Sequence, residues 1–148
     1  MRRSGLLGFL RNLKDSRHSA VLKIPSDNKH IRKISGRILS ALAPHGVSEE
    51  KTFDIKLCVE EAVRNAIVHG NRSQKHRTVT AAWRIDGDRI TIEVEDEGEG
   101  FDPAALPDPT DPDYIMRNSG RGVYLIRKLM DSVAFSERGK KITMVKKF

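Results

Sequence analysis

The sequence places a carboxylate and an amide four residues apart, Glu61 and Asn65, in a stretch whose apolar residues recur at helical spacing. Side chains four apart are neighbours on a helix, and two polar groups in an apolar stripe are costly unless paired or ligated. An amide oxygen is a hard, neutral ligand for Mg²⁺, and a nearby carboxylate can accept the proton of an attacking hydroxyl. The pair therefore suits phosphoryl transfer. The alternative is a buried pair that caps a loop or binds a backbone group.

Helical spacing also separates Glu61 from the adjacent Glu60. At about 100° per residue, Glu60 falls in one sector with Lys56 and Arg64, which we expect to be a solvated face. Glu61 falls in the sector of Asn65. The carboxylate beside the amide is therefore Glu61.

A second segment, residues 96–100, follows directly after an expected strand. Gly98 and Gly100 permit backbone angles and close approaches that other residues cannot adopt. Asp96, at the strand end, is placed to accept a hydrogen bond from an amino group of a ligand. The alternatives are an acidic β-turn or a calcium loop, although the twelve-residue spacing of calcium ligands is absent.

A third segment holds two glycines, Gly120 and Gly122, around Arg121 at the expected start of a helix. The free backbone N–H groups of a helix start bind phosphate, and arginine offsets phosphate charge. The preceding loop, residues 97–119, is acidic and would repel metal-free phosphate, so a phosphate site here needs a divalent cation. The three segments together predict a site for ATP and Mg²⁺.

Five strands and three helices are expected to position these segments. Strand patterns occupy residues 20–24, 78–85, 89–95, 133–136 and 142–146, and helical patterns occupy residues 27–42, 48–69 and 122–131. The order β-α-α-β-β-loop-α-β-β predicts an α+β fold. We expect a two-layer α/β sandwich, in which a mixed, mostly antiparallel sheet carries its helices on one face.

Length and composition fit one domain, because 148 residues with 38% hydrophobic and 32% charged side chains can bury a core. We expect this domain at residues 19–148, after a basic leader, residues 1–18, that is either disordered or a short amphipathic helix. The single cysteine, Cys58, excludes an internal disulfide and suits the cytoplasm. No apolar run is long enough to span a bilayer, and the leader's apolar part is too short for a secretory signal. We therefore expect a cytoplasmic protein.

The net charge of +7 lies at the two ends of the chain. Residues 1–18 and residues 137–148 each carry +4, which leaves −1 for the rest. Because the body of the domain is not basic, we expect no direct nucleic-acid binding. The basic ends are expected to be solvated, with an acidic partner or a membrane surface as the alternative.

The three segments, in this order and at these spacings, resemble the GHKL ATPase superfamily, whose members share the Bergerat ATP-binding fold. The resemblance covers residues from about 20 to 148 and is nearest to the bacterial anti-sigma-factor serine/threonine-protein kinases. Residues 60–70 resemble the family's first box, residues 96–101 its second and residues 119–131 its third.

The resemblance implies a role for each matching residue. Asn65 would coordinate Mg²⁺, and Glu61 would be the general base for a partner's serine hydroxyl. Asp96 would bind the adenine amino group. The remaining positions would shape the pocket or cradle the phosphates: Gly98, Gly100, Gly120, Arg121 and Gly122. Residues 97–119 would form a lid over the nucleotide.

The resemblance also implies partners. The phosphoacceptor would be an anti-sigma-factor antagonist protein, and the kinase would alternately bind a sigma factor. A homodimer is a further expectation from the family.

One stretch departs from the family pattern. The family often has adjacent Gly and Thr near its last strand, on the adenine side, whereas three residues separate Gly139 from Thr143 here. The adenine edge of the pocket is therefore expected to differ from that of the family.

Two further functions stay open at this point. An ATP-binding regulatory module would hold nucleotide and a protein partner without transferring phosphate. A detached catalytic domain of a histidine kinase would need its phosphoacceptor in trans. Glu61 favours the serine kinase, because a pure binding module does not need a base.

Overall fold

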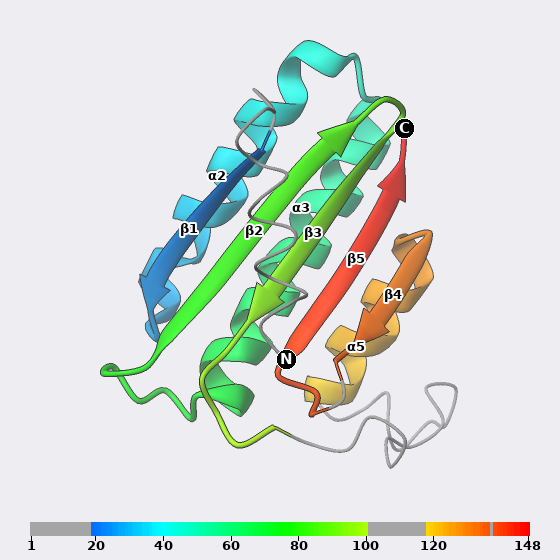
Figure 1. Ribbon diagram of the computed structural model, residues 1–148. Helices are drawn as coiled ribbons and strands as arrows, with labels where there is room; N and C mark the ends of the chain where they lie inside the picture. Colours follow the sequence, from blue (N-terminus) through cyan, green and yellow to red (C-terminus); the bar gives the residue numbers. More distant parts are fainter. Residues whose placement is uncertain (1–18, 101–117, 137) are drawn as a thin grey trace.

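The computed structural model describes residues 19–100, 118–136 and 138–148, with only the backbone described at residues 118–120. The described strands form one open sheet in the order β1-β2-β3-β5-β4. Their bounds are β1 Ser19–Pro25, β2 Thr78–Asp86, β3 Arg89–Glu95, β4 Ser132–Phe135 and β5 Lys141–Lys147. Each described pairing is antiparallel. Three helices lie on one face of this sheet (Figure 1), namely α2 Ile31–Leu42, α3 Glu49–Asn65 and α5 Asn118–Leu129. The predicted α+β sandwich is confirmed.

Successive side chains of a strand point to opposite faces of the sheet, and one of these faces packs on the helices. Side chains from the two central strands alternate between buried and more exposed, as expected where only one face of a sheet packs on helices. The buried set includes Val79, Ala81, Trp83, Ile90, Ile92 and Val94. The helices contribute the apolar residues of their inner faces, among them Ile34, Ile38, Ile55, Val59 and Ile126. Strands and helices thus share one core.

Two of the predicted helix starts are confirmed by their caps. The side chain of Asp27 accepts a hydrogen bond from Lys29 N at 3.1 Å, and a short 3₁₀ turn, Asn28–His30, leads into α2. The side chain of Ser48 accepts from Lys51 N at 3.2 Å at the start of α3. Both caps satisfy backbone donors that have no partner within the helix.

The helix α3 ends in a π-helical turn, Ala66–Gly70, rather than in a regular α-helical turn. Asn71 N donates to Ala66 O at 2.8 Å, which closes this wider turn. Single π turns often occur at functional sites, because the extra residue re-aims the side chains that follow. Here the turn places Gly70 and Asn71 beside the residues that follow β3.

The helix α5 begins at Asn118, four residues before its expected start at residue 122. Glycine weakens a helix but does not prevent one, so Gly120 and Gly122 are accommodated within the first turns. In a helix that begins at Asn118, the N–H of Gly120 is among those without an intrahelical acceptor, whereas the N–H of Gly122 is not. Gly122 must therefore serve another purpose.

Several expectations fall outside the described residues. They are the leader at residues 1–18 and most of the expected lid, residues 101–117. Among the helices that the structure does describe, none has the length and apolar character of a membrane span. Cys58 is buried, and burial raises the pKa of its thiol to about 12.

Candidate active site

The face of α3 turned toward α5 carries the predicted pair, Glu61 and Asn65. The two helices pack against each other, and Gly122 of α5 lies opposite the pair. A methyl group at position 122 would stand 2.7 Å from Glu61 Oε2 and 3.2 Å from Asn65 Nδ2. The first distance is shorter than real Cβ contacts and the second is tighter than most, so a Cβ here would force the Glu61 carboxylate to shift. Gly122 therefore lets the polar pair face a bare helix backbone.

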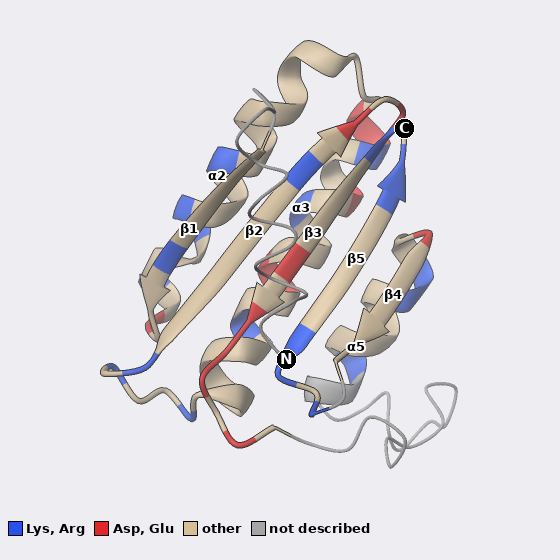
Figure 2. Ribbon diagram, in the orientation of Figure 1, with Lys and Arg blue, Asp and Glu red and all other residues tan. Residues whose placement is uncertain are grey.

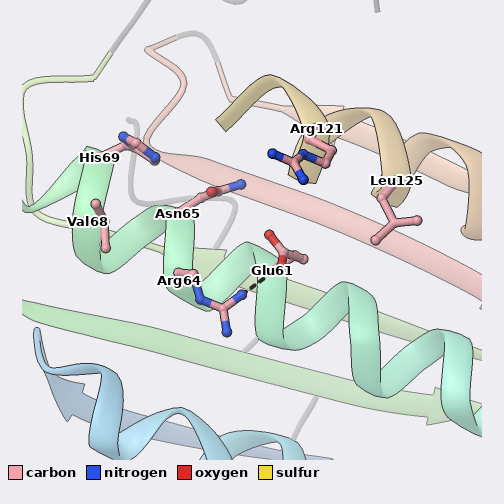
Figure 3. Close-up of a pocket in the computed structure, with 8 residues that line it drawn as sticks. Glu61, Arg64, Asn65, Val68, His69, Arg121 and Leu125 are labelled. Carbon is pink, nitrogen blue, oxygen red and sulfur yellow. Dashed lines mark hydrogen bonds and ion pairs between the residues drawn. The ribbon is translucent and has the colours of Figure 1, made fainter. Parts of the chain in front are cut away.

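A pocket of about 430 Å³ opens beside this contact. Its lining combines the predicted pair with residues from both helices, namely Arg64, Val68, His69, Arg121 and Leu125. Figure 3 shows Glu61 and Asn65 directed toward α5, with the Arg121 side chain on the opposite wall. The structure thus brings together four of the predicted site residues: Glu61, Asn65, Arg121 and Gly122. Gly120 is described by its backbone alone, in the first turn of α5.

The expected solvated sector of α3 behaves differently from the prediction. Glu60 accepts a hydrogen bond from Ser35 Oγ of α2 at 2.8 Å, so this carboxylate joins the two helices. The Arg64 side chain is directed toward Glu61 and forms an ion pair with it, Nη1 to Oε1, at 2.7 Å. The neighbouring helix is the reason, because α2 offers a hydroxyl where sequence periodicity indicated only solvent. Glu61, and not Glu60, lines the pocket.

The second segment lies at the C-terminal end of the same helix. A Cβ at Gly70 would stand 2.2 Å from Asp96 Oδ2, and a Cβ at Gly98 would stand 1.9 Å from Gly70 O. The turn is closed locally by a hydrogen bond from Gly98 N to Asp96 Oδ1 at 2.8 Å. Gly98 and Gly70 thus allow the backbone after β3 to lie against the π turn, with the Asp96 side chain between them.

Burial raises the pKa of the Asp96 carboxyl above its ordinary value, and the hydrogen bond from Gly98 N opposes this shift. Nearby charges are those of Lys140 and Arg77, which favour the ionised form, and Glu95, which disfavours it. Figure 2 shows that acidic residues continue from β3 into the following loop. An acceptor that is partly desolvated and fixed in orientation suits the recognition of a ligand amino group.

Gly100 is held at the other side of this loop. Its φ of +83° lies in the left-handed region, and a Cβ would stand 2.1 Å from Arg138 O. Gly100 therefore packs against the turn that joins β4 to β5. Thr143 pairs with Glu93 in the sheet, whereas the buried Ile142 and Met144 on either side of it face the helices. The unusual spacing from Gly139 thus leaves Thr143 on the sheet face opposite the pocket.

A buried residue that the sequence pattern did not identify ties these parts together. Asn71, which has no exposed surface, donates through Nδ2 to Ser26 Oγ at 2.8 Å and to Thr78 O at 3.0 Å. Its Oδ1 accepts from Glu97 N at 2.8 Å. Glu97 in turn accepts from the backbone N–H and the hydroxyl of Thr78. Asn71 therefore fixes the residue next to Asp96. The only signal in the sequence was an Asn where a helix stops, which ordinarily indicates a cap.

A cofactor can be tested against these residues by their chemistry. The Asn65 amide and the Glu61 carboxylate are oxygen ligands of the kind Mg²⁺ takes, and Mg²⁺ ordinarily fills its remaining positions with water and phosphate. Among the described residues, no group of three or more His, Cys, Asp or Glu side chains could hold a metal by itself. The donor set thus fits a Mg²⁺ ion that keeps water and phosphate oxygens among its ligands.

Comparison with known proteins agrees with this geometry. A family model described as the histidine kinase-like ATPase domain matches residues 24–146. Serine-protein kinase RsbW of Staphylococcus epidermidis is 30% identical over 134 residues, which cover 84% of each chain. Anti-sigma F factor of Clostridium perfringens is 34% identical over 129 residues, which cover 82% of this chain and 89% of the relative.

Proposed function

Because the chain belongs to the histidine kinase-like ATPase family, we propose that it is an ATP-dependent protein-serine kinase. Its substrate would be an antagonist protein in a partner-switching system that controls a sigma factor. The observation that carries this proposal is the Glu61–Asn65 pair, which faces the bare backbone of Gly122 inside a pocket. The names of the relatives, a serine-protein kinase and an anti-sigma factor, support the same class.

The proposed roles divide the site into two ends. At the adenine end, Asp96 would accept a hydrogen bond from the amino group, and Gly98 and Gly100 would let the base approach the backbone. At the phosphate end, the start of α5 would hold the phosphates through Gly120 and Arg121. Gly122 would keep that helix close to α3. Asn65 would contribute one ligand to Mg²⁺, which when bound would neutralise phosphate charge.

The proposed step is an in-line transfer. The serine oxygen of the acceptor attacks the γ-phosphorus of ATP, and the bond from that phosphorus to the β,γ-bridging oxygen breaks. ADP leaves with the electron pair of that bond, and the serine proton passes to the Glu61 carboxylate. The residues of the chain thus position the reactants and take up one proton.

The partners follow from the same proposal. The acceptor is an antagonist protein with a reactive serine, and the alternate partner is a sigma factor, which would place the activity in the cytoplasm. A homodimer is part of the proposal because the family resemblance implies it.

The test is transfer of radiolabelled phosphate from ATP with Mg²⁺ to candidate antagonist proteins. We expect Glu61→Gln to lower the transfer rate by about 10²–10⁴-fold, the usual contribution of a general base. The matched control is Glu60→Gln, which changes an adjacent carboxylate that contacts α2 instead of the pocket, and it should keep most of the activity. The label should survive acid and be lost in base, as phosphoserine does; the reverse would indicate phosphohistidine. Undiminished transfer by Glu61→Gln would reject the base assignment.

The second candidate is the ATP-binding regulatory module. The ion pair between Glu61 and Arg64 favours this module, since the guanidinium occupies Oε1, one of the two oxygens that could receive the serine proton. ATP binding by the wild-type protein, without labelling of any candidate acceptor, would support this module over the kinase.

A further inference from the structure

The two oxygens of the carboxylate proposed as the base lie beside different neighbours, Arg64 and the backbone of Gly122. Arg64 Nη1 lies 2.7 Å from Glu61 Oε1. Glu61 Oε2 occupies the space beside Gly122 where a side chain would otherwise stand. Figure 3 shows Glu61 between Arg64 and α5, with the Arg64 guanidinium on the outer side. A hydroxyl that approaches Oε1 from the side of Arg64 therefore meets the guanidinium first.

The pair is positioned for exchange of partners rather than for permanent burial. The Arg64 side chain is 45% exposed and that of Glu61 is 22% exposed. Exposed pairs three residues apart on a helix are weak. A protein that docks over the pocket can displace Arg64 through its own contacts, whereas a water molecule brings no such contacts.

We propose that Arg64 is a positioning residue that makes the site select a protein acceptor over water. The inference rests on the proposed function, because it takes Glu61 as the base. With Arg64 on Oε1, Glu61 does not take the proton of a water molecule. When an acceptor docks, Arg64 turns away, and Oε1 becomes available to the serine hydroxyl.

The suppressed side reaction is hydrolysis of ATP. Water attacks the γ-phosphorus, the bond to the β,γ-bridging oxygen breaks, and ADP leaves with that electron pair. One proton of the water passes to Glu61, and the products are ADP and inorganic phosphate. The other charged group lining the pocket, Arg121, lies on α5 and is unchanged by a substitution at Arg64.

The experiment measures ATP hydrolysis with Mg²⁺ and no acceptor protein. Arg64→Ala should raise the rate about two- to fivefold, the range expected when an exposed ion pair is removed. Arg64→Lys, which keeps a cation beside Glu61, should stay near the wild-type rate. The matched control is Arg89→Ala: Arg89 is 47% exposed, pairs with Asp88 at 3.3 Å and lies in the β2–β3 hairpin, outside the pocket. It should leave hydrolysis unchanged.

The double variant Glu61→Gln/Arg64→Ala separates this inference from the function on which it rests. Loss of the increase in the double variant supports Arg64 acting through Glu61. A rate in Arg64→Ala equal to or below wild type overturns the inference, while the proposed function stands if Glu61→Gln still abolishes transfer. An increase in the hydrolysis rate that persists in the double variant also overturns the inference. Should Arg64→Ala not fold, Arg64→Gln carries the same test, with circular dichroism to verify folding.

Discussion

At the scale of single residues, the site depends on a missing side chain. Gly122 is placed so that any Cβ would collide with Glu61 Oε2, at 2.7 Å, and approach Asn65 Nδ2, at 3.2 Å. The position is nevertheless helical, where alanine is intrinsically favoured over glycine. Stability and activity therefore make opposite demands at this residue.

Gly122→Ala should thus damage the proposed chemistry more than the fold. Displacing Glu61 and Asn65 by a fraction of an ångström should lower phosphoryl transfer, by up to roughly 100-fold for a shift near 1 Å. The control is Gly36→Ala in α2, where a Cβ meets nothing within 4 Å, and where the gain in stability should be about 0.5–1 kcal/mol. Transfer rates and thermal melts of both variants provide the measurement. Full activity in Gly122→Ala would show that the close approach is unimportant.

The proposed role of Asp96 predicts that ATP binding depends on pH. Its ionised form is the better acceptor for an amino group, and burial raises its pKa in the free protein. As the pH falls, Asp96 becomes protonated at a higher pH than an ordinary aspartate does, so ATP affinity should decline over that interval and recover above it. Titration of a fluorescent ATP analogue between pH 4 and pH 8 measures this. Asp96→Asn should bind more weakly and retain only the pH dependence of the nucleotide itself. Parallel curves for wild type and Asp96→Asn would contradict the assignment.

Among the elements, Asn71 connects the π turn after α3 to three other parts of the chain: the residue after β1, the start of β2 and the loop after β3. Its side chain makes three hydrogen bonds, to Ser26, Thr78 and Glu97. The π turn that precedes it brings the side chain inward. Because Asn71 and Ser26 are buried, the polar groups around the amide lose hydrogen bonds that water does not readily replace when the amide is removed.

Asn71→Ala should therefore lower the free energy of unfolding by about 1–3 kcal/mol. It should also weaken ATP binding, since Glu97 N anchors the loop beside Asp96. Asn28→Ala, at an exposed asparagine of the 3₁₀ turn before α2, is the control and should change neither property. Urea denaturation and nucleotide titration are the measurements. A variant with wild-type stability would mean that water replaces the amide.

At the scale of the whole molecule, the proposed ligand would bridge three parts of the chain. Nucleotide with Mg²⁺ would contact α3, the loop after β3 and the start of α5, and a ligand that binds only the folded state stabilises it. At a concentration 100 times Kd, the gain is about 2.7 kcal/mol, or roughly 5–10 °C in Tm. Asn65→Ala should remove most of the increase in Tm that requires Mg²⁺. A melt with ATP alone, with ATP and Mg²⁺, and with Mg²⁺ alone tests this; equal Tm values in all three would argue against the site.

The order and approximate bounds of the described strands and helices were predictable from the sequence, and so was the helix face that carries Glu61 and Asn65. Strand alternation and helical spacing are local patterns that repeat over a few residues. They predict each described strand to within two residues, and they place Glu61 and Asn65 on the same face of their helix. Helix ends were less well determined, because glycine at Gly120 and Gly122 resembles a helix start as much as a helix interior.

The contacts between residues of different elements were not predictable from the sequence and are seen only in the folded structure. Glu60 bonds to Ser35, Gly122 lies against Glu61, and Asn71 reaches Glu97 because helices and strands distant in the chain pack together. Such contacts depend on the approach of two surfaces, and no periodicity in one segment records the distance to another. Arg64 shows the same limit: it is exposed, as its spacing predicts, but the spacing does not record that its guanidinium pairs with Glu61 beside the pocket.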